Sequence, residues 1–299
     1  VCSSDLFSLF RKDPQIDIKI DGNPELKKKY GRIQKQDIPI YGQNETVQGT
    51  ISVVPPEGKT ISHQGVNLKL FGEFRNEKGE VLSRFFVRSQ FLTPAGVLSQ
   101  PINTEFKFDH LSFPTSSYYG TSVNVYYGVE VVIVHRISDF IIQKPFDVLI
   151  FSPAQKDEPI HNEVGIKNVL HIEFVFPKSW YDVEETVCGA AYFILVKLRI
   201  VHMSVSVYRN EIYEDNNTYF KTKTVLKTYE IMDGAPVRGD NIPIRLYMGD
   251  SDIWSYTKFR DSPLRVEQFL RVQLIDENGK KYFKRSEERR VGKECRSRW

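Results

Sequence analysis

Apolar and polar residues alternate along most of this chain, in the pattern of a β-strand that buries one face. Near the start, Ile16, Ile18 and Ile20 enclose Asp17 and Lys19. The same spacing recurs in five further apolar sets: Val66, Leu68 and Leu70; Phe106 and Phe108; Val123, Val125, Tyr127, Val129, Val131 and Ile133; Ile172, Phe174 and Phe176; and Leu270, Val272 and Leu274. Turn-forming Pro, Gly and Asn residues separate these sets at distances too short for helical crossovers. The chain is therefore predicted to be all-β, with mostly antiparallel sheets.

The apolar period changes its parity within residues 190–207. The apolar positions are first Ile194, Val196, Leu198 and Ile200, and then Val201, Met203, Val205 and Val207. Because side chains alternate between the two faces of a strand, this shift predicts a bulge or a strand that bends between sheets. Lys197 and Arg199 interrupt the run, which argues against a segment that inserts into a membrane.

A convincing amphipathic helical period is absent from the sequence. The best candidate is residues 138–143, which lie just before Pro145. Proline cannot continue a helix interior, so only a short helix stays open there.

Both ends of the chain are expected to be non-native. Residues 1–6 and 285–299 resemble translated sequencing adapter, and the tail has no apolar period that could bury a face. Setting them aside leaves 278 of the 299 residues, which suits two domains better than one. Apolar alternation stops around residues 151–159, where Pro, Asp and Glu gather. We therefore predict two antiparallel β-sandwich domains, residues 7–158 and 159–284.

Charge and cysteine content exclude several classes of function. The net charge of +3 falls to +1 without the ends, which hold six basic and four acidic residues. The remaining sequence has no basic cluster interleaved with aromatic residues, so nucleic-acid binding is not expected. The ends also hold Cys2 and Cys295, and Cys188 alone cannot build a disulfide framework or a zinc site. With no signal-type segment and no apolar run of membrane-spanning length, a cytoplasmic protein is expected.

The sequence offers no convincing catalytic arrangement. His171 and Glu173 lie two residues apart on a predicted strand and therefore face the same side. They are the best metal pair, but a metal site needs three or four ligands. Glu184 and Glu185 are consecutive and point to opposite faces, and Cys188 is predicted to pack in a core. We therefore predict no enzyme, no metal and no cofactor; a β-sandwich hydrolase using His171 or Glu173 is the enzyme alternative.

The most informative run is Tyr229 to Gly239, which reads YEIMDGAPVRG. It places two large apolar residues, Ile231 and Met232, directly before the turn-forming sequence Asp-Gly-Ala-Pro. A surface turn cannot bury both side chains within its own short arc. The pair therefore needs either a neighbouring core or the surface of a partner protein.

This run, together with further matching segments, resembles the arrestin-like subunit of retromer, the vacuolar protein sorting protein 26 family. The other segments are HQGV at 63–66, EVGI at 163–166, LHIEF at 170–174 and KYFK at 281–284. The resemblance covers nearly all of residues 16–284 and implies an arrestin-like pair of sandwiches. It implies a noncatalytic scaffold of the endosomal coat that helps to capture transmembrane cargo for transport from endosomes to the Golgi or for recycling.

The resemblance also implies roles for four residues. Ile231 and Met232 match the pair that docks on the helical-solenoid subunit, vacuolar protein sorting protein 35. Val164 and Phe283 match residues that line the cargo pocket, where a sorting nexin helps to hold the cytosolic tail of a cargo protein. Membrane association would then be indirect and peripheral, on endosomes.

Two related readings stay open. One is the paralogous subunit of the commander and retriever recycling complex, and the other is an α-arrestin-type adaptor. The α-arrestin adaptors carry Pro-Tyr tails, and the only tail here is the adapter-like segment. Because that segment follows Lys284, the final strand of the family is expected to be missing, leaving an open sheet edge.

Overall fold

The computed structural model describes residues 13–30, 37–151, 158–181, 185–215, 218–249 and 261–285. Two compact units make up the chain, one formed by Val1–Ser117 with Asn124–Phe151 and the other by Tyr118–Val123 with Ser152–Trp299. The second part of the second unit begins at Ser152, the boundary predicted from the sequence is at 158, and residues 152–157 of the predicted linker lie outside the described residues. The segment Tyr118–Val123, which belongs to the second unit, has no counterpart in the prediction.

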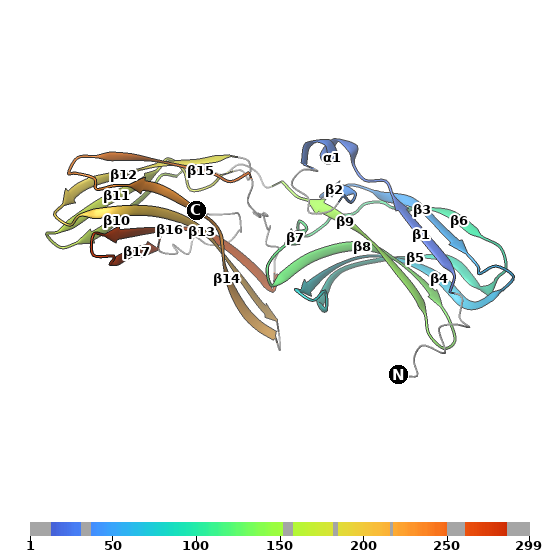
Figure 1. The fold of residues 1–299 in the computed structure, drawn as a ribbon. Helices are drawn as coiled ribbons and strands as arrows, with labels where there is room; N and C mark the ends of the chain where they lie inside the picture. The colour runs from blue at the N-terminus through green and yellow to red at the C-terminus, as the bar shows by residue number, and fades with distance from the viewer. Residues whose placement is uncertain are drawn as a thin grey trace. The chain divides into compact units, whose positions relative to one another are not determined.

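The first unit contains two β-sheets (Figure 1). The smaller has the order β1-β3-β6, and the larger has the order β2-β9-β8-β4-β5. The strands are β1 (Gln15–Ile20), β2 (Ile40–Gly42), β3 (Val47–Val54), β4 (Ile61–Asn76), β5 (Val81–Leu98), β6 (Ile102–Phe108), β8 (Val123–Val134) and β9 (Phe140–Leu149). The short strand β7 (Tyr118–Tyr119) lies in the segment that belongs to the second unit. Strand β1 pairs antiparallel with β3, β3 with β6, β4 with β5 and β8 with β9, whereas β2 pairs parallel with β9. The residues predicted to share a face of β8, from Val123 to Ile133, are all buried.

The second unit is a sandwich of two four-stranded sheets. One has the order β10-β11-β12-β15 and the other the order β14-β13-β16-β17. The strands are β10 (Ile160–Ile166), β11 (Leu170–Phe176), β12 (Thr186–Val196), β13 (Ile200–Asp215), β14 (Thr218–Asp233), β15 (Asn241–Tyr247), β16 (Leu264–Asp276) and β17 (Lys281–Arg285). One core contains residues of both sheets, among them Ile172 and Phe174 from β11 and Leu270 and Leu274 from β16. The prediction of an all-β, arrestin-like sandwich architecture is confirmed.

A single helix, α1 (Pro24–Tyr30), is present among the described residues. The Oδ1 atom of Asn23 accepts hydrogen bonds from the backbone N–H groups of Glu25 and Leu26, at 2.9 and 3.1 Å. Asn23 is thus the N-cap, and Pro24 follows at the first helical position. The helix was missed because it buries no residue and so has no apolar period. The helix considered at 138–143 is wrong, because β9 begins there at Phe140.

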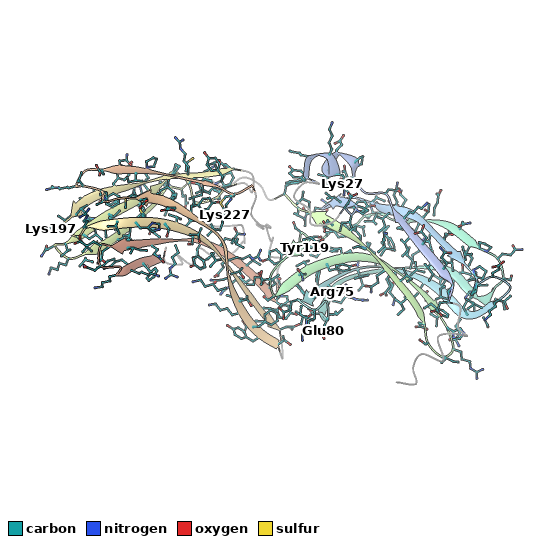
Figure 2. All side chains as sticks on the ribbon, viewed as in Figure 1. Lys27, Arg75, Glu80, Tyr119, Lys197 and Lys227 are labelled. Atoms are coloured by element: carbon teal, nitrogen blue, oxygen red, sulfur yellow. The ribbon has the colours of Figure 1, made fainter. Side chains whose placement is uncertain are left out.

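The parity shift in 190–207 marks the passage of the chain from one sheet to the other, as predicted. β12 ends at Val196, and β13 begins in the opposite sheet at Ile200; Lys197 lies in the connection between them (Figure 2). The predicted inward position of Ile194 is nevertheless wrong, because Phe193 is buried and Ile194 is exposed, whereas Val196 of the same predicted set packs against the core. A bulge explains this: Ile172 pairs with Phe193 and His171 with Leu195, so Ile194 has no partner in the register.

The predicted burial of Cys188 is also wrong. Val187 occupies the inner position of β12, and the neighbouring Cys188 is exposed on the opposite face. Residues alternate strictly in this part of the strand, so only one of the two can face the core.

Candidate functional site

The apolar pair Ile231 and Met232 lies at the end of β14, an outermost strand of its sheet. Met232 pairs with Met203 and Glu230 with Ser204, so Ile231 is an extra residue at a bulge. The bulge interrupts the alternation of faces, and both side chains pack against the core of the second unit while staying partly accessible. The pair is thus half-buried, and its role in docking stays a prediction.

The connection after this pair is fixed by hydrogen bonds. The backbone N–H of Gly234, with φ of 132°, donates to the carbonyl oxygen of Val201 at 2.9 Å. The N–H of Gly239 donates to the carbonyl of Phe193 at 2.8 Å, and the N–H of Val237 donates to Asp240 Oδ2 at 2.7 Å. The turn predicted from the sequence is therefore present, and it holds Val237 exposed as a further apolar residue that the prediction missed.

Val164 and Phe283 each lie on an outermost strand, but in different sheets. Val164 in β10 is 9% exposed and belongs to the core of the second unit. Phe283 in β17 is 47% exposed, and its ring lies 3.9 Å from the guanidinium carbon of Arg271. Tyr282, the preceding residue, is the one that packs toward the core. A pocket that holds both side chains stays a prediction.

The strand pairing adds a third residue to His171 and Glu173. Glu163 on β10 pairs directly with Glu173 on β11, and one carboxylate oxygen of each lies 3.5 to 3.6 Å from His171 Nε2. A similar group, His202, Glu230 and Asp233, lies at the start of β13 and the end of β14. In that group His202 Nδ1 is 3.2 Å from Glu230 Oε1. Sequence patterns alone could not identify Glu163, because it joins the other two residues only through the register of β10 with β11.

The two glutamates predicted to point to opposite faces are Glu184 and Glu185. Glu184 lies outside the described residues, and Glu185 forms an ion pair with Lys178 at 2.5 Å.

A buried carboxylate, Glu211 of β13, binds the segment Tyr118–Val123 within the second unit. Its Oε1 accepts hydrogen bonds from Tyr118 Oη and from the N–H of Thr121, both at 2.8 Å. Its Oε2 accepts from the N–H of Ser122 at 2.7 Å and from the Ser122 hydroxyl at 2.6 Å. Arg209 Nε lies 2.9 Å from Oε1. A Cβ at Gly120 would lie 2.5 Å from the same oxygen, so the close approach requires glycine.

Burial alone would raise the pKa of Glu211, but the hydrogen bonds from Ser122 and Thr121 and the charge of Arg209 hold this pKa below the usual carboxyl range. The carboxylate is therefore ionised and fully engaged with its partners. We assign it a structural role, since its acceptor sites are occupied by the protein itself.

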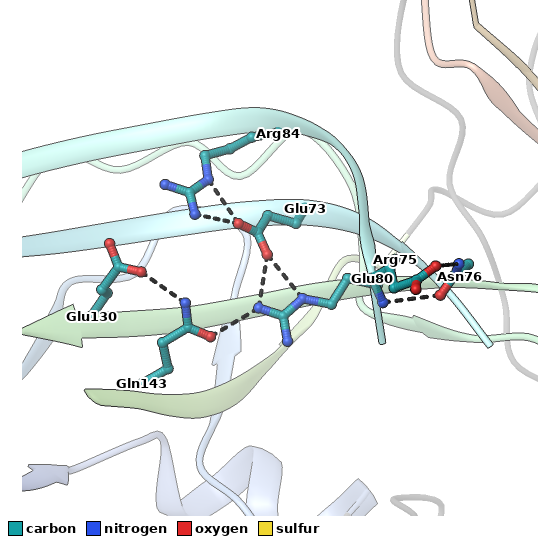
Figure 3. A network of polar contacts seen from close by, with 7 residues as sticks. All are labelled: Glu73, Arg75, Asn76, Glu80, Arg84, Glu130 and Gln143. Atoms are coloured by element: carbon teal, nitrogen blue, oxygen red, sulfur yellow. Dashed lines mark hydrogen bonds and ion pairs between the residues drawn. The ribbon is translucent and has the colours of Figure 1, made fainter. Parts of the chain in front are cut away.

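The first unit holds a second polar network, which joins four strands of one sheet (Figure 3). Glu73 on β4 accepts from Arg84 Nε on β5 at 2.7 Å and from Arg75 Nε at 2.9 Å. Arg75 Nη2 also donates to Gln143 Oε1 on β9 at 3.0 Å, and Gln143 Nε2 donates to Glu130 on β8 at 2.7 Å. These ion pairs and hydrogen bonds fasten the four strands together, and Lys69 Nζ lies 3.5 Å from Glu130 Oε1 as a further cation.

Among the residues that the structure describes, no helix has the length and apolar character needed to cross a bilayer. Two all-β units, with a sandwich that presents a half-buried apolar pair at a strand end, define a protein of the arrestin-like class. The family model described as vacuolar protein sorting-associated protein 26 matches residues 10–279. The chain therefore belongs to the vacuolar protein sorting-associated protein 26 family.

Curated relatives agree with this assignment. Vacuolar protein sorting-associated protein 26 of Plasmodium falciparum is 32% identical over 289 residues, which are 94% of this chain and 97% of that protein. The protein of the same name from Schizosaccharomyces pombe is 31% identical, covering 93% of this chain and 95% of the relative. Vacuolar protein sorting-associated protein 26B-B of Xenopus laevis is 33% identical, covering 85% of this chain and 76% of the relative.

Proposed function

We propose that this chain is a noncatalytic scaffold subunit of the retromer coat, with a role in vacuolar and endosomal protein sorting. It would dock through the end of β14 on the helical-solenoid subunit, vacuolar protein sorting protein 35. It would also help to capture the cytosolic tails of transmembrane cargo. Its association with the endosome membrane would be peripheral and mediated by these protein partners.

One observation carries the docking part of this proposal. Ile231 and Met232 lie side by side in the run that most resembles the family, and the bulge keeps both partly accessible at an outermost strand. Adjacent apolar residues that reach a surface together can enter a groove between helices as one anchor. Such anchors dominate the binding energy of many interfaces, and truncating one costs about 2 kcal/mol or more.

The fixed connection after the pair supports the same proposal. The hydrogen bonds of Gly234, Val237 and Gly239 hold this surface in one conformation before a partner arrives. A preorganised surface loses less conformational entropy on binding. The exposed side chain of Val237 would add to the apolar contact.

Binding of the purified chain to the solenoid subunit, measured by isothermal titration calorimetry, tests the proposal. Ile231→Asp should weaken binding about thirtyfold or more, because it places a charge in an apolar contact. Val225→Asp is the matched control, since Val225 lies on the same strand and is 51% exposed. It should bind as the unaltered chain does, and circular dichroism should show both variants folded.

Unchanged affinity of a folded Ile231→Asp variant would reject docking through this surface. Binding to the solenoid subunit of the commander and retriever complex in place of the retromer subunit would favour the paralogue alternative. Failure to bind either solenoid would leave the α-arrestin-type adaptor as the better reading.

For cargo capture, the two strands that carry Val164 and Phe283 are both sheet edges. An extended tail could add to such an edge through backbone hydrogen bonds, while apolar side chains select an aliphatic residue of the tail. Phe283→Ala should weaken binding of a fluorescent cargo-tail peptide in the presence of a sorting nexin. The exposed Tyr247 of β15 provides the matched control, and Tyr247→Ala should have no effect. Equal binding by both variants would remove Phe283 from the pocket.

A further inference from the structure

Three potential metal ligands project from the same face of the β10–β11 pair in the second unit. The antiparallel register sets Glu163 opposite Glu173 and Gly165 opposite His171. Side chains at directly paired positions, and at positions two apart on one strand, lie on one face of a sheet. Glu163, His171 and Glu173 therefore converge outside the core, while Val164 faces inward.

The distances within this group, which we call the β10–β11 triad, are unusual for hydrogen bonds. His171 Nε2 lies 3.6 Å from Glu163 Oε2 and 3.5 Å from Glu173 Oε1. Both exceed the usual range of about 2.7 to 3.2 Å for an N–H donor and an oxygen acceptor. The His171 side chain is 37% exposed, yet its Nε2 atom is buried and makes no hydrogen bond.

The same distances suit ligands around one metal ion. Zinc binds imidazole nitrogen and carboxylate oxygen at about 2.0 to 2.2 Å in a tetrahedral arrangement, which places neighbouring ligand atoms about 3.4 Å apart. All three ligand atoms of the triad lie within 4.8 Å of one another. Imidazole nitrogen and carboxylate oxygen are both zinc ligands, and zinc sites that keep an open position have three protein ligands.

We propose that the β10–β11 triad binds one Zn²⁺ ion through Glu163, His171 and Glu173, with water in the fourth position. The imidazole nitrogen selects a transition metal over Ca²⁺ or Mg²⁺, which prefer six or more oxygen ligands. The ion would fasten the outermost strand β10 to β11 and neutralise two facing carboxylates. This site goes beyond the scaffold function and does not depend on it.

The second group of potential metal ligands, His202, Glu230 and Asp233, is less suited to bind a metal than the β10–β11 triad. Its His202 Nδ1 lies 3.2 Å from Glu230 Oε1, close enough for a hydrogen bond that already uses the nitrogen. Its two carboxylate residues are exposed and flank the pair proposed to dock. We therefore place the metal on the β10–β11 triad.

Zinc titration of the full chain tests this site. Cys2, Cys188 and Cys295 are first replaced by serine, because a thiolate would compete for the ion. Calorimetry with zinc chloride in a non-coordinating buffer at neutral pH should give one saturable site. Substituted Co²⁺ should give the visible absorption of a tetrahedral ion, and hydrogen exchange of the β10 amides should slow when zinc is added.

His171→Asn should weaken zinc binding by at least the roughly tenfold loss caused by removing a supporting residue of a metal site. Glu163→Gln, a smaller change at an exposed position, should act in the same direction. His202→Asn is the matched control and should leave the affinity unchanged.

Three results would overturn the proposal. They are the absence of saturable binding at millimolar zinc, equal binding by the unaltered and His171→Asn chains, and loss of binding in His202→Asn alone. The first would identify the triad as a surface ion pair only, and the last would move the metal to the second group.

Discussion

The two units each bury a glutamate carboxylate, and they satisfy it in different ways. In the first unit Glu73 is 0% exposed and is paired with Arg75 and Arg84, whose side chains are 17% and 33% exposed. In the second unit Glu211 and its partner Arg209 are only 1% and 4% exposed. The other partners of Glu211 are hydrogen-bond donors of the segment Tyr118–Ser122.

Glu73 therefore stabilises contacts between neighbouring strands, whereas Glu211 stabilises a contact between segments that are far apart in the sequence. The Glu73 network joins neighbouring strands of one sheet, and its arginines can reach water. Glu211 instead holds a segment about 90 residues away in sequence, and loss of its charge would leave Arg209 buried without its partner ion. The second unit, which carries all four residues of the proposed function, should therefore depend more on a single carboxylate.

The largest effect is expected for Glu211→Gln. Removing one member of a buried ion pair leaves the other charge uncompensated, and the amide would also oppose N–H donors. We expect a loss of about 3 kcal/mol in the stability of the second unit. Native-state hydrogen exchange of the β13 amides measures it, with Glu214→Gln, an exposed change on the same strand, as the control.

A smaller effect is expected for Glu73→Gln in the first unit. Arg75 and Arg84 are partly accessible, so water can replace part of the lost interaction, and the cost should be about 1 to 2 kcal/mol. Native-state hydrogen exchange of the β4 amides measures this loss of stability. Glu77→Gln, the same substitution at an exposed position, is the control. A loss of stability equal to or above that of Glu211→Gln would show that the accessible arginines do not lower the cost of losing the Glu73 charge.

The smallest effect is expected on how the stability of the second unit depends on pH. Since the pKa of Glu211 is held below its usual range, the unfolded chain binds this proton more readily than the folded chain. The stabilisation is complete above the ordinary carboxyl pKa of about 4.3 and is lost as the pH falls through the lower folded value. The stability of the second unit should thus decline less steeply in Glu211→Gln than in the unaltered chain as the pH falls below the ordinary carboxyl pKa of about 4.3. Parallel declines would show that Glu211 is not the group responsible.

Much of the fold followed from apolar alternation, and the exceptions have local causes. Sets such as Ile172 with Phe174, and Leu270 with Leu274, were predicted on the inner face and are buried there. Ile194 departs from the pattern because a bulge gives it no partner. Helix α1 left no apolar signal, although its Asn-Pro start is a capping signal that could have revealed it.

The sites were less predictable, because they depend on pairing between distant residues. His171 and Glu173 are two apart in sequence, but Glu163 joins them only through the β10–β11 register. The partners of Glu211 come from a segment that no sequence spacing connects to β13. For Ile231 and Met232, the sequence identified an apolar pair before a turn, while the bulge that leaves both half-buried required the structure.

Docking of the end of β14 on the solenoid subunit can be measured by hydrogen exchange of the full chain, with and without that subunit. We expect slower exchange of amides within residues 229–239 in the complex, with the β4 and β5 amides of the first unit unchanged. Slowing confined to the first unit, with no change at the end of β14, would show that docking does not use this surface.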